Sequence, residues 1–516
     1  MAAPSPATET VNCDFLVVGA GSSGCVLTSR LVRAGLKVLL IEKGPTNAST
    51  LSKLVRRPSD WVRQASREKG LSEVFATVPQ AGLNNRRLPA YSGCGGGGTS
   101  NVNAALYQRG REEDYEEHWP WELKDIEASF KSVEAELTLE ELPTTGTIAP
   151  SYSRMLEEIG FNPAPRSLTA AESSTDDGYT EPTWTKEGLG GCPMKRTTTK
   201  GGDRQSAWAA FVAPVTTMPN LKIKDGAVVS RVIIEGGRAV GVEIVESARG
   251  WFGGTRVRQL RLAKERAEVI VCCGAYRSPK LLMLSGVGPK RHLEEKGVSV
   301  VVDMPHVGEN LQDHLVLFNT NLSKTPMVEA DYTADSFHAA TYFSCALPTP
   351  LPEASEGPSA TADATGSSPP SPAAVVGVLH CEGSLVAQNL GWFAGMLIPR
   401  PGLLGALARA ALLAFCGVIC GVIGLIAPLR NALKSTRSSL MLLTTIKSKG
   451  TVRLASGTDA FAPPLIDPVL DAPAGPTGNV RVLAHGPPGK SGDGRRQGCF
   501  GRRDRAWGKV QQRRRR

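Results

Sequence analysis

The sequence contains no pair or cluster of cysteines and histidines with the spacing of a zinc site. Its 11 cysteines are an odd number, are scattered from Cys13 to Cys499, and include the adjacent pair Cys272 and Cys273. This distribution does not resemble the disulfide framework of a small secreted protein. We therefore expect an intracellular protein in a reducing compartment, without a metal centre.

The first eleven residues lack the basic start and the apolar run of a secretory signal, and we interpret them as a short leader. The chain also lacks an internal repeat. Aromatic residues are sparse at 6%, but 41% hydrophobic and 21% charged residues over 516 positions are typical of a globular protein with a large core. Global disorder and a lone small binding module are excluded.

The net charge of +10 belongs to the end of the chain. Residues 475–516 hold 12 Lys and Arg against 2 Asp and Glu, whereas the remaining 474 residues are balanced. A basic tail is typical of binding to nucleic acid or an acidic membrane. The alternative, which we favour, is a non-native ending, such as one produced by a shifted reading frame or a mispredicted exon. We therefore expect no specific nucleic-acid partner.

Strand and helix patterns alternate from residue 14 onward. Residues 14–18 predict a buried strand, a glycine-rich turn follows, and a helix ends near Gly35 before a second strand at 36–41. This order is a βαβ unit. A further helix is predicted at 125–139. Two strands within 228–245, broken by Gly236 and Gly237, and another strand at 268–273 are typical of an α/β or α+β protein.

The turn after the first strand reads Gly19-Ala-Gly21-Ser22-Ser23-Gly24. Gly19 permits the tight turn, Gly21 lets the main chain approach a pyrophosphate, and Gly24 lets helix and strand pack closely. Glu42, at the end of the second strand, is placed to accept hydrogen bonds from ribose hydroxyls and would repel an NADP-type phosphate. These residues predict a dinucleotide site but do not separate FAD from NAD.

A second glycine cluster occupies residues 92–103, where Gly93, Gly97, Gly98, Thr99, Ser100, Val102 and Asn103 match the first signature of the glucose-methanol-choline (GMC) oxidoreductases. In this match Cys94 replaces an arginine and Gly96 replaces an aliphatic residue. The second signature is fuller: residues 274–289, from Gly274 through Ser278 to Pro289, and residues 307–314 agree with it. The sequence therefore resembles the GMC family over most of residues 14–468.

The resemblance implies an FAD protein that oxidises the CH–OH group of a small-molecule alcohol, choline or alcohol dehydrogenase-like, with hydride transfer to the flavin. It implies an α/β fold in which a discontinuous, Rossmann-like FAD-binding domain carries a sheet-containing α+β substrate domain. It also implies that cofactor contacts come from Gly19, Gly21, Ser22, Ser23, Gly24, Glu42, Gly97, Gly98, Thr99, Asn103, Ala104, Val229 and Gly274, with Val229 at the adenine. The family's catalytic histidine segment has no counterpart after Pro468, so the catalytic residue is unknown.

The expected domain map follows from the same resemblance. FAD-binding parts are expected at 12–120 and 206–318, and substrate-domain parts at 121–205, 319–345 and 436–470. Between them we expect a disordered insert at 346–375 and a hydrophobic insert at 376–435, with a basic low-complexity tail at 475–516.

Residues 410–429 form a run of 20 without a charge, which is long enough to span a bilayer. Three glycines and Pro428 inside the run are equally compatible with a core or surface helix. Association with a membrane and a lipophilic alcohol would both suit this insert.

Two other interpretations stay open. A fatty acid photodecarboxylase resembles GMC proteins closely, but Thr444 and Thr445 stand where its Cys and Arg are expected. A truncated or catalytically dead protein that still binds flavin is the other alternative.

Overall fold

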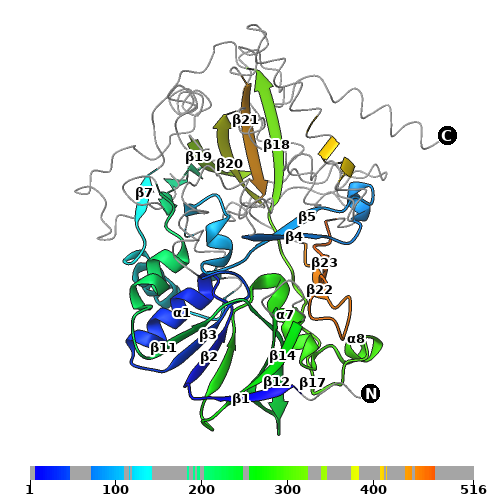
Figure 1. The fold of residues 1–516 in the computed structure, drawn as a ribbon. Helices are drawn as coiled ribbons and strands as arrows, with labels where there is room; N and C mark the ends of the chain where they lie inside the picture. Colours follow the sequence, from blue (N-terminus) through cyan, green and yellow to red (C-terminus); the bar gives the residue numbers. More distant parts are fainter. Residues whose placement is uncertain are drawn as a thin grey trace, which may run out of the picture.

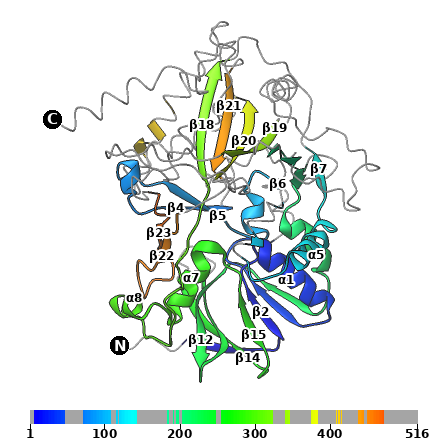
Figure 2. The same cartoon turned by 180° about the vertical axis from the view of Figure 1, so that it is seen from behind.

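The computed structural model describes residues 6–46, 71–107, 109, 115–116, 119–141, 183–184, 190–191, 195–197, 203–247, 255–322, 339–345, 374–382, 407–408, 410–411, 414, 436–443 and 448–470. Figures 1 and 2 show these residues in two parts, with an α/β part below an antiparallel sheet. The α/β part carries the two glycine clusters and positions the candidate site.

A parallel sheet of four strands lies at the centre of the α/β part, in the order β11 (Leu221–Lys224), β3 (Val38–Ile41), β2 (Phe15–Val18) and β15 (Glu268–Val271). β3 is buried along its whole length and β2 nearly so, which explains their unbroken apolar sequences. α1 (Ser22–Arg33) connects them and ends just before Gly35, whose φ is +82°. The predicted βαβ unit is confirmed.

A second sheet packs beside the first, in the order β1 (Ala7–Val11), β14 (Thr255–Leu262), β13 (Arg238–Ser247) and β12 (Ala227–Glu235). Gly236 and Gly237, both at positive φ, form the predicted break between β12 and β13. The interpretation of the first eleven residues as a leader is wrong for residues 7–11, which form β1. This strand pairs in parallel with the edge of β14, and Glu9 forms an ion pair with Arg258.

Besides α1, the described residues form further helical segments. They are α7 (Gly274–Leu284) after β15, α8 (Lys290–Glu295), α5 (Leu123–Glu134), the π-helix η4 (Trp208–Val212) and the short 3-10 turns η2 (Ala81–Leu83), η3 (Gly98–Asn101) and η5 (Ala213–Val215). α5 realises the helical spacing predicted from residue 125. Two apolar clusters, one on each face of the parallel sheet, form the core.

The upper sheet in Figure 1 is antiparallel, in the order β18 (Leu315–Leu322), β21 (Thr436–Leu443), β20 (Ala374–Glu382) and β19 (Ala339–Cys345). β20 crosses the boundary expected between the inserts at 375 and 376. Because it pairs with β19 on one side and β21 on the other, residues 374–382 are part of this sheet and not of an insert.

The remaining strands form smaller sheets of two or three strands. They consist of β4 (Ser72–Ala76) with β5 (Pro89–Gly93), β22 (Thr451–Arg453) with β23 (Leu465–Asp467), β16 (Val287–Gly288) with β17 (Val302–Asp303), β8 (Thr183–Trp184) with β9 (Gly190–Gly191), and β6 (Leu106–Tyr107) with β10 (Lys195–Thr197) and β7 (Leu139–Glu141).

Several expectations lie outside the described residues. They concern residues 346–373, Thr444 and Thr445, the basic tail at 475–516, and all of 410–429 except positions 410, 411 and 414. Among the residues that are described, none of the helices has the length and apolar character needed to cross a membrane.

Candidate functional site: a nucleotide cavity between two glycine loops

A cavity of about 400 Å³ lies where β2 and β15 end and α1 begins. Of the residues predicted to contact a cofactor, the cavity is lined by Gly19, Gly21, Ser22, Ser23, Glu42, Gly98, Thr99, Val229 and Gly274. These come from five separate stretches of chain, which the parallel sheet brings to one edge. The site therefore lies at the carboxyl ends of the strands, where open α/β sheets bind ligands.

The three glycines of the first loop have different surroundings. At Gly19, where φ is +100°, a side chain would collide with the Cys272 carbonyl, and at Gly24 it would collide with the Gly19 carbonyl. At Gly21 a Cβ atom would meet only the Cys272 oxygen, 4.0 Å away. Gly21 thus leaves bare main chain beside open space in the cavity, and Gly24 lies behind it in the packing of helix on strand.

The N-terminus of α1 faces the same space. Gly21 is its N-cap, with no side-chain cap and no acidic residue in the first turn. The first N–H groups of a helix have no acceptor within the helix, and the helix dipole adds positive potential there. These donors and the room beside Gly21 fit the diphosphate of a dinucleotide.

The second glycine cluster packs directly on the first. The Gly97 N–H donates to the Ala20 carbonyl at 2.8 Å, and a Cβ on Gly98 would come within 2.7 Å of the Gly21 Cα. At Gly96 a Cβ would lie 2.5 Å from the ring of Trp208. The aliphatic side chain that the GMC signature has at this position is therefore replaced here by a buried tryptophan from a distant segment.

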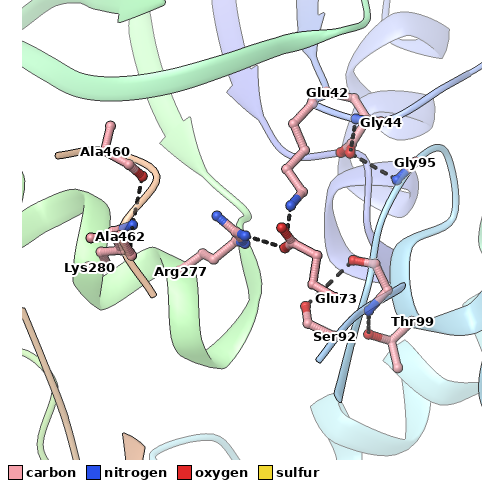
Figure 3. A network of polar contacts seen from close by, with 12 residues as sticks. Glu42, Gly44, Glu73, Ser92, Gly95, Thr99, Arg277, Lys280, Ala460 and Ala462 are labelled. Carbon is pink, nitrogen blue, oxygen red and sulfur yellow. Dashed lines mark hydrogen bonds and ion pairs between the residues drawn. The ribbon is translucent and has the colours of Figure 1, made fainter. Parts of the chain in front are cut away.

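Glu42 is buried at the cavity edge and joins three loops. Its Oε2 accepts the Ala20 N–H at 2.8 Å. Its Oε1 accepts the N–H groups of Gly44 at 2.9 Å and Gly95 at 3.0 Å (Figure 3). A carboxylate offers about four acceptor positions. Three of the acceptor positions of Glu42 are thus occupied by backbone N–H groups of the protein. Roughly one acceptor position is left for the ribose contact predicted from the sequence.

Three cations that the sequence analysis did not single out also line the cavity: Lys43, Arg277 and Lys280. Lys43 and Arg277 both form ion pairs with the same oxygen of Glu73, on β4 (Figure 3). Burial raises the pKa of Glu73, but the attraction of Arg277 and Lys43 outweighs it and holds the pKa below its ordinary value. Because two cations share one carboxylate, this wall keeps a net positive charge, which suits an anionic ligand.

Not every predicted residue reaches the cavity. Gly24, Gly97, Asn103 and Ala104 do not line it. The Asn103 Oδ1 accepts hydrogen bonds from Arg204 at 2.7 Å and from the Ala105 N–H at 3.0 Å. Arg204 is buried and also binds the carbonyls of Ser100 and Asn103, so it fixes the end of the second glycine cluster.

The cysteines at the cavity are thiols. Cys272 and Cys273 line it, and burial raises the pKa of Cys273 to about 12. The thiolate is the nucleophilic form of cysteine. Cys273 is thus a packing residue and not a nucleophile near neutral pH.

Three of the described histidines are not placed to act as a base at this cavity. None of His292, His306 and His314 lines it. His292 Nε2 accepts the Leu454 N–H at 3.0 Å, which is a structural contact. Within the described part of the chain, the catalytic residue therefore stays unassigned.

Comparison with known proteins agrees with this geometry. The family model for GMC oxidoreductase matches residues 13–316. An alcohol dehydrogenase [acceptor] from Pseudomonas putida is 35% identical over 61% of this chain and 56% of its own length. An oxygen-dependent choline dehydrogenase from Rhizobium johnstonii is 34% identical over 61% of this chain and 55% of its own. The chain thus spans little more than half the length of these relatives.

Two solved structures share the fold. Pyridoxine 4-oxidase from Mesorbium loti has a TM-score of 0.60 at 22% identity, over 89% of this chain and 76% of that chain. A formate oxidase of Aspergillus oryzae, studied for FAD modification, has a TM-score of 0.61 at 18% identity, over 90% of this chain and 78% of that chain. With more than half of its residues matched by the family model, the chain belongs to the GMC oxidoreductase family.

Proposed function

We propose that this protein binds FAD in the cavity between the two glycine loops and oxidises the CH–OH group of a small-molecule alcohol. The observation that carries the proposal is the space beside Gly21, closed on one side by Gly98 and faced by the uncapped start of α1. That combination of bare main chain and free N–H donors fits a phosphate group, and its place after the first strand of a βαβ unit is where dinucleotide-binding folds hold the diphosphate.

The chain's own residues bind and orient the cofactor. Gly21, Ser22 and Ser23 are placed to hold the diphosphate, and Glu42 supports both loops around it. Val229, on β12, lines the cavity where the family resemblance implies an adenine contact. When bound, FAD supplies the acceptor for the hydride of the alcohol carbon.

The substrate class rests on the relatives, which are named as alcohol and choline dehydrogenases. A lipophilic alcohol and membrane contact through residues 410–429 are finer parts of this proposal, supported only by the apolar sequence of that run. The proposed reducing, intracellular location is supported by five described cysteines that are all free: Cys13, Cys25, Cys94, Cys272 and Cys273.

Reconstitution of the purified full chain with FAD tests cofactor binding. We expect a yellow protein that retains FAD through gel filtration. Gly21→Val should abolish retention without unfolding the chain, because Gly21 is in an extended conformation and its Cβ would enter open space. Ala34→Val enlarges a side chain to the same isopropyl group at the exposed far end of α1 and should retain FAD. A colourless wild-type protein would refute the proposal.

The reaction is tested on the FAD-loaded protein without oxygen. Choline, and separately a long-chain primary alcohol, are added while flavin absorbance is recorded. Bleaching by either supports the oxidoreductase and distinguishes the two substrate types. Carbon dioxide release from a fatty acid under light would instead identify a photodecarboxylase, and a loaded flavin that responds to neither would identify an inert flavin-binding protein.

A further inference from the structure

Lys280 is a buried lysine in the wall of the cavity. It lies on α7, is 5% exposed, and lines the cavity together with Ala460. Its Nζ donates to the carbonyls of Ala460 at 2.7 Å and Ala462 at 2.6 Å (Figure 3). A side chain of the family-matched region thus holds a turn that is 180 residues further along the chain.

The turn that Lys280 holds is organised by its own polar groups. Ser456 Oγ accepts the N–H groups of Thr458 and Asp459, and the Asp459 carboxylate accepts the Phe461 N–H at 2.8 Å. The Ala462 N–H donates to the Asp459 carbonyl at 3.2 Å. These hydrogen bonds determine the internal shape of the turn at residues 456–462. The position of the turn against α7 depends on other contacts, including those of Lys280.

The flanks of this turn are attached elsewhere. On one side the Val452 N–H donates to the Gly308 carbonyl at 2.7 Å, and on the other Ile466 accepts the Val78 N–H at 2.8 Å. Between these attachments, Lys296 Nζ also donates to the Ala455 carbonyl just before the turn, but this hydrogen bond is exposed and Lys296 does not line the cavity. Lys280 is the buried contact that joins the turn to the cavity wall.

We propose that Lys280 is a positioning residue for the nucleotide. It fixes the turn at residues 456–462 so that Ala460 forms part of the wall of the FAD cavity. The inference rests on the proposed FAD function and assigns to that function a segment beyond the matched residues 13–316. The two hydrogen bonds from the Lys280 ammonium to these part-buried carbonyls are charge-assisted. Their removal leaves both carbonyls without this donor and lets Ala460 withdraw from the cavity.

The experiment compares Lys280→Met with Lys296→Met in the full chain. Both variants remove an ammonium that donates to the same segment, but only Lys280 lines the cavity. FAD dissociation constants are measured from flavin fluorescence. We expect Lys280→Met to weaken FAD retention roughly tenfold or more, the loss typical of a charged hydrogen bond, and Lys296→Met to leave it unchanged.

A second readout does not depend on FAD. Phe461 is 57% exposed between the two held carbonyls, so chymotrypsin cleavage after Phe461, followed by mass spectrometry, reports whether the turn is docked. We expect faster cleavage in Lys280→Met and, in the wild type, slower cleavage once FAD is added. Should Lys280→Met fail to fold, Lys280→Gln, which keeps a neutral donor, takes its place with the same expected direction.

The outcomes separate the two proposals. A wild type that does not bind FAD refutes the proposed function, while the chymotrypsin comparison still shows whether Lys280 docks the turn. Faster cleavage with an unchanged FAD dissociation constant makes Lys280 purely structural and overturns the inference. Equal behaviour of the Lys280→Met and Lys296→Met proteins overturns it as well.

Discussion

Glu42 connects the two glycine loops through a single carboxylate that accepts three backbone N–H groups. The sequence pattern assigned this residue to the ribose, because a βαβ fingerprint normally ends in such an acid. The structure adds a second role, since Gly95 is 53 residues away and belongs to the other loop. A change at Glu42 thus affects how the cavity is assembled as well as what it binds.

Glu42→Gln should destabilise the protein and weaken FAD binding together. The amide replaces one acceptor oxygen with an NH2 group, so at least one buried N–H loses its partner, at a cost of about 1–3 kcal/mol. Urea unfolding and FAD titration measure the two effects. Glu127→Gln, at an exposed position of α5, is the matched control and should change neither. A stable variant with unaltered FAD affinity would contradict the role described for Glu42.

Lys280 should make the free energy of unfolding increase with pH in the alkaline range. The pKa of Lys280 is lowered to about 8, chiefly by burial and also by Arg277 and Lys43, while Asp459 and Glu73 oppose the shift. In the unfolded chain the pKa returns to about 10.4, so between the two values the unfolded state binds more protons. The contribution of this group to the free energy of unfolding therefore rises with pH across that window.

Urea unfolding of wild type and Lys280→Met at several pH values between about 7.5 and 10.5 checks this. The difference between the two proteins isolates Lys280 from the other groups that titrate there. We expect wild type to gain stability relative to the variant as pH rises. A constant difference would show that Lys280 has an ordinary pKa in the folded protein.

At the scale of elements, the segment from β22 to β23 is attached to α8 by a histidine. His292 Nε2 accepts the Leu454 N–H, which only the neutral ring can do. Burial lowers the pKa of His292, with Arg453 and Lys296 adding to the effect and Glu295 opposing it. Because the folded-state pKa is the lower one, the unfolded chain binds more protons in the window below the ordinary histidine pKa, and stability falls on acidification through it.

Acidification from about pH 7.5 to 5 should thus raise amide hydrogen exchange at Leu454 before the parallel sheet is affected. His292→Gln keeps a carbonyl acceptor without a titrating ring and should remove the acid-dependent increase in hydrogen exchange at Leu454. His306→Gln, at an exposed histidine nearby, should leave the wild-type acid response in place. Exchange at Leu454 that does not depend on pH beyond the intrinsic chemistry would refute this expectation.

Elements determined by neighbouring residues could be predicted from the sequence. β2, α1 and β3 follow from apolar runs and from glycines at Gly19 and Gly35, and the β12–β13 hairpin follows from Gly236 and Gly237. Backbone conformation at a positive φ is a local property, which is why glycine spacing predicts it.

Elements that depend on distant partners could not be predicted in the same way. β1 exists because β14 offers an edge some 250 residues away, and β20 exists because β19 and β21 flank it. The same holds in the cavity, where Lys280 meets Ala460 and Trp208 fills the space above Gly96. A lysine after a proline in a helix gives no local sign of such a partner.

At the scale of the whole molecule, FAD should stabilise the sheet and the distant turn as one unit. A ligand that binds only the folded state adds about 2.7 kcal/mol at a concentration one hundred times its dissociation constant. We expect a higher melting temperature and slower hydrogen exchange in residues 15–42 and 455–462 alike. Gly21→Val provides the control, with no shift on FAD addition. Protection limited to the first stretch would show that the turn is independent of the nucleotide.

The wall formed by Ala460 also bears on biosynthesis. The glycine loops, β12 and α7 all leave the ribosome well before residues 456–462, and domains fold as units during synthesis. In the nascent chain, the cavity between the glycine loops is therefore still open on the side that Ala460 later forms. Among the described residues that line the cavity, Ala460 is the last to be synthesised, so this side of the cavity closes late in translation.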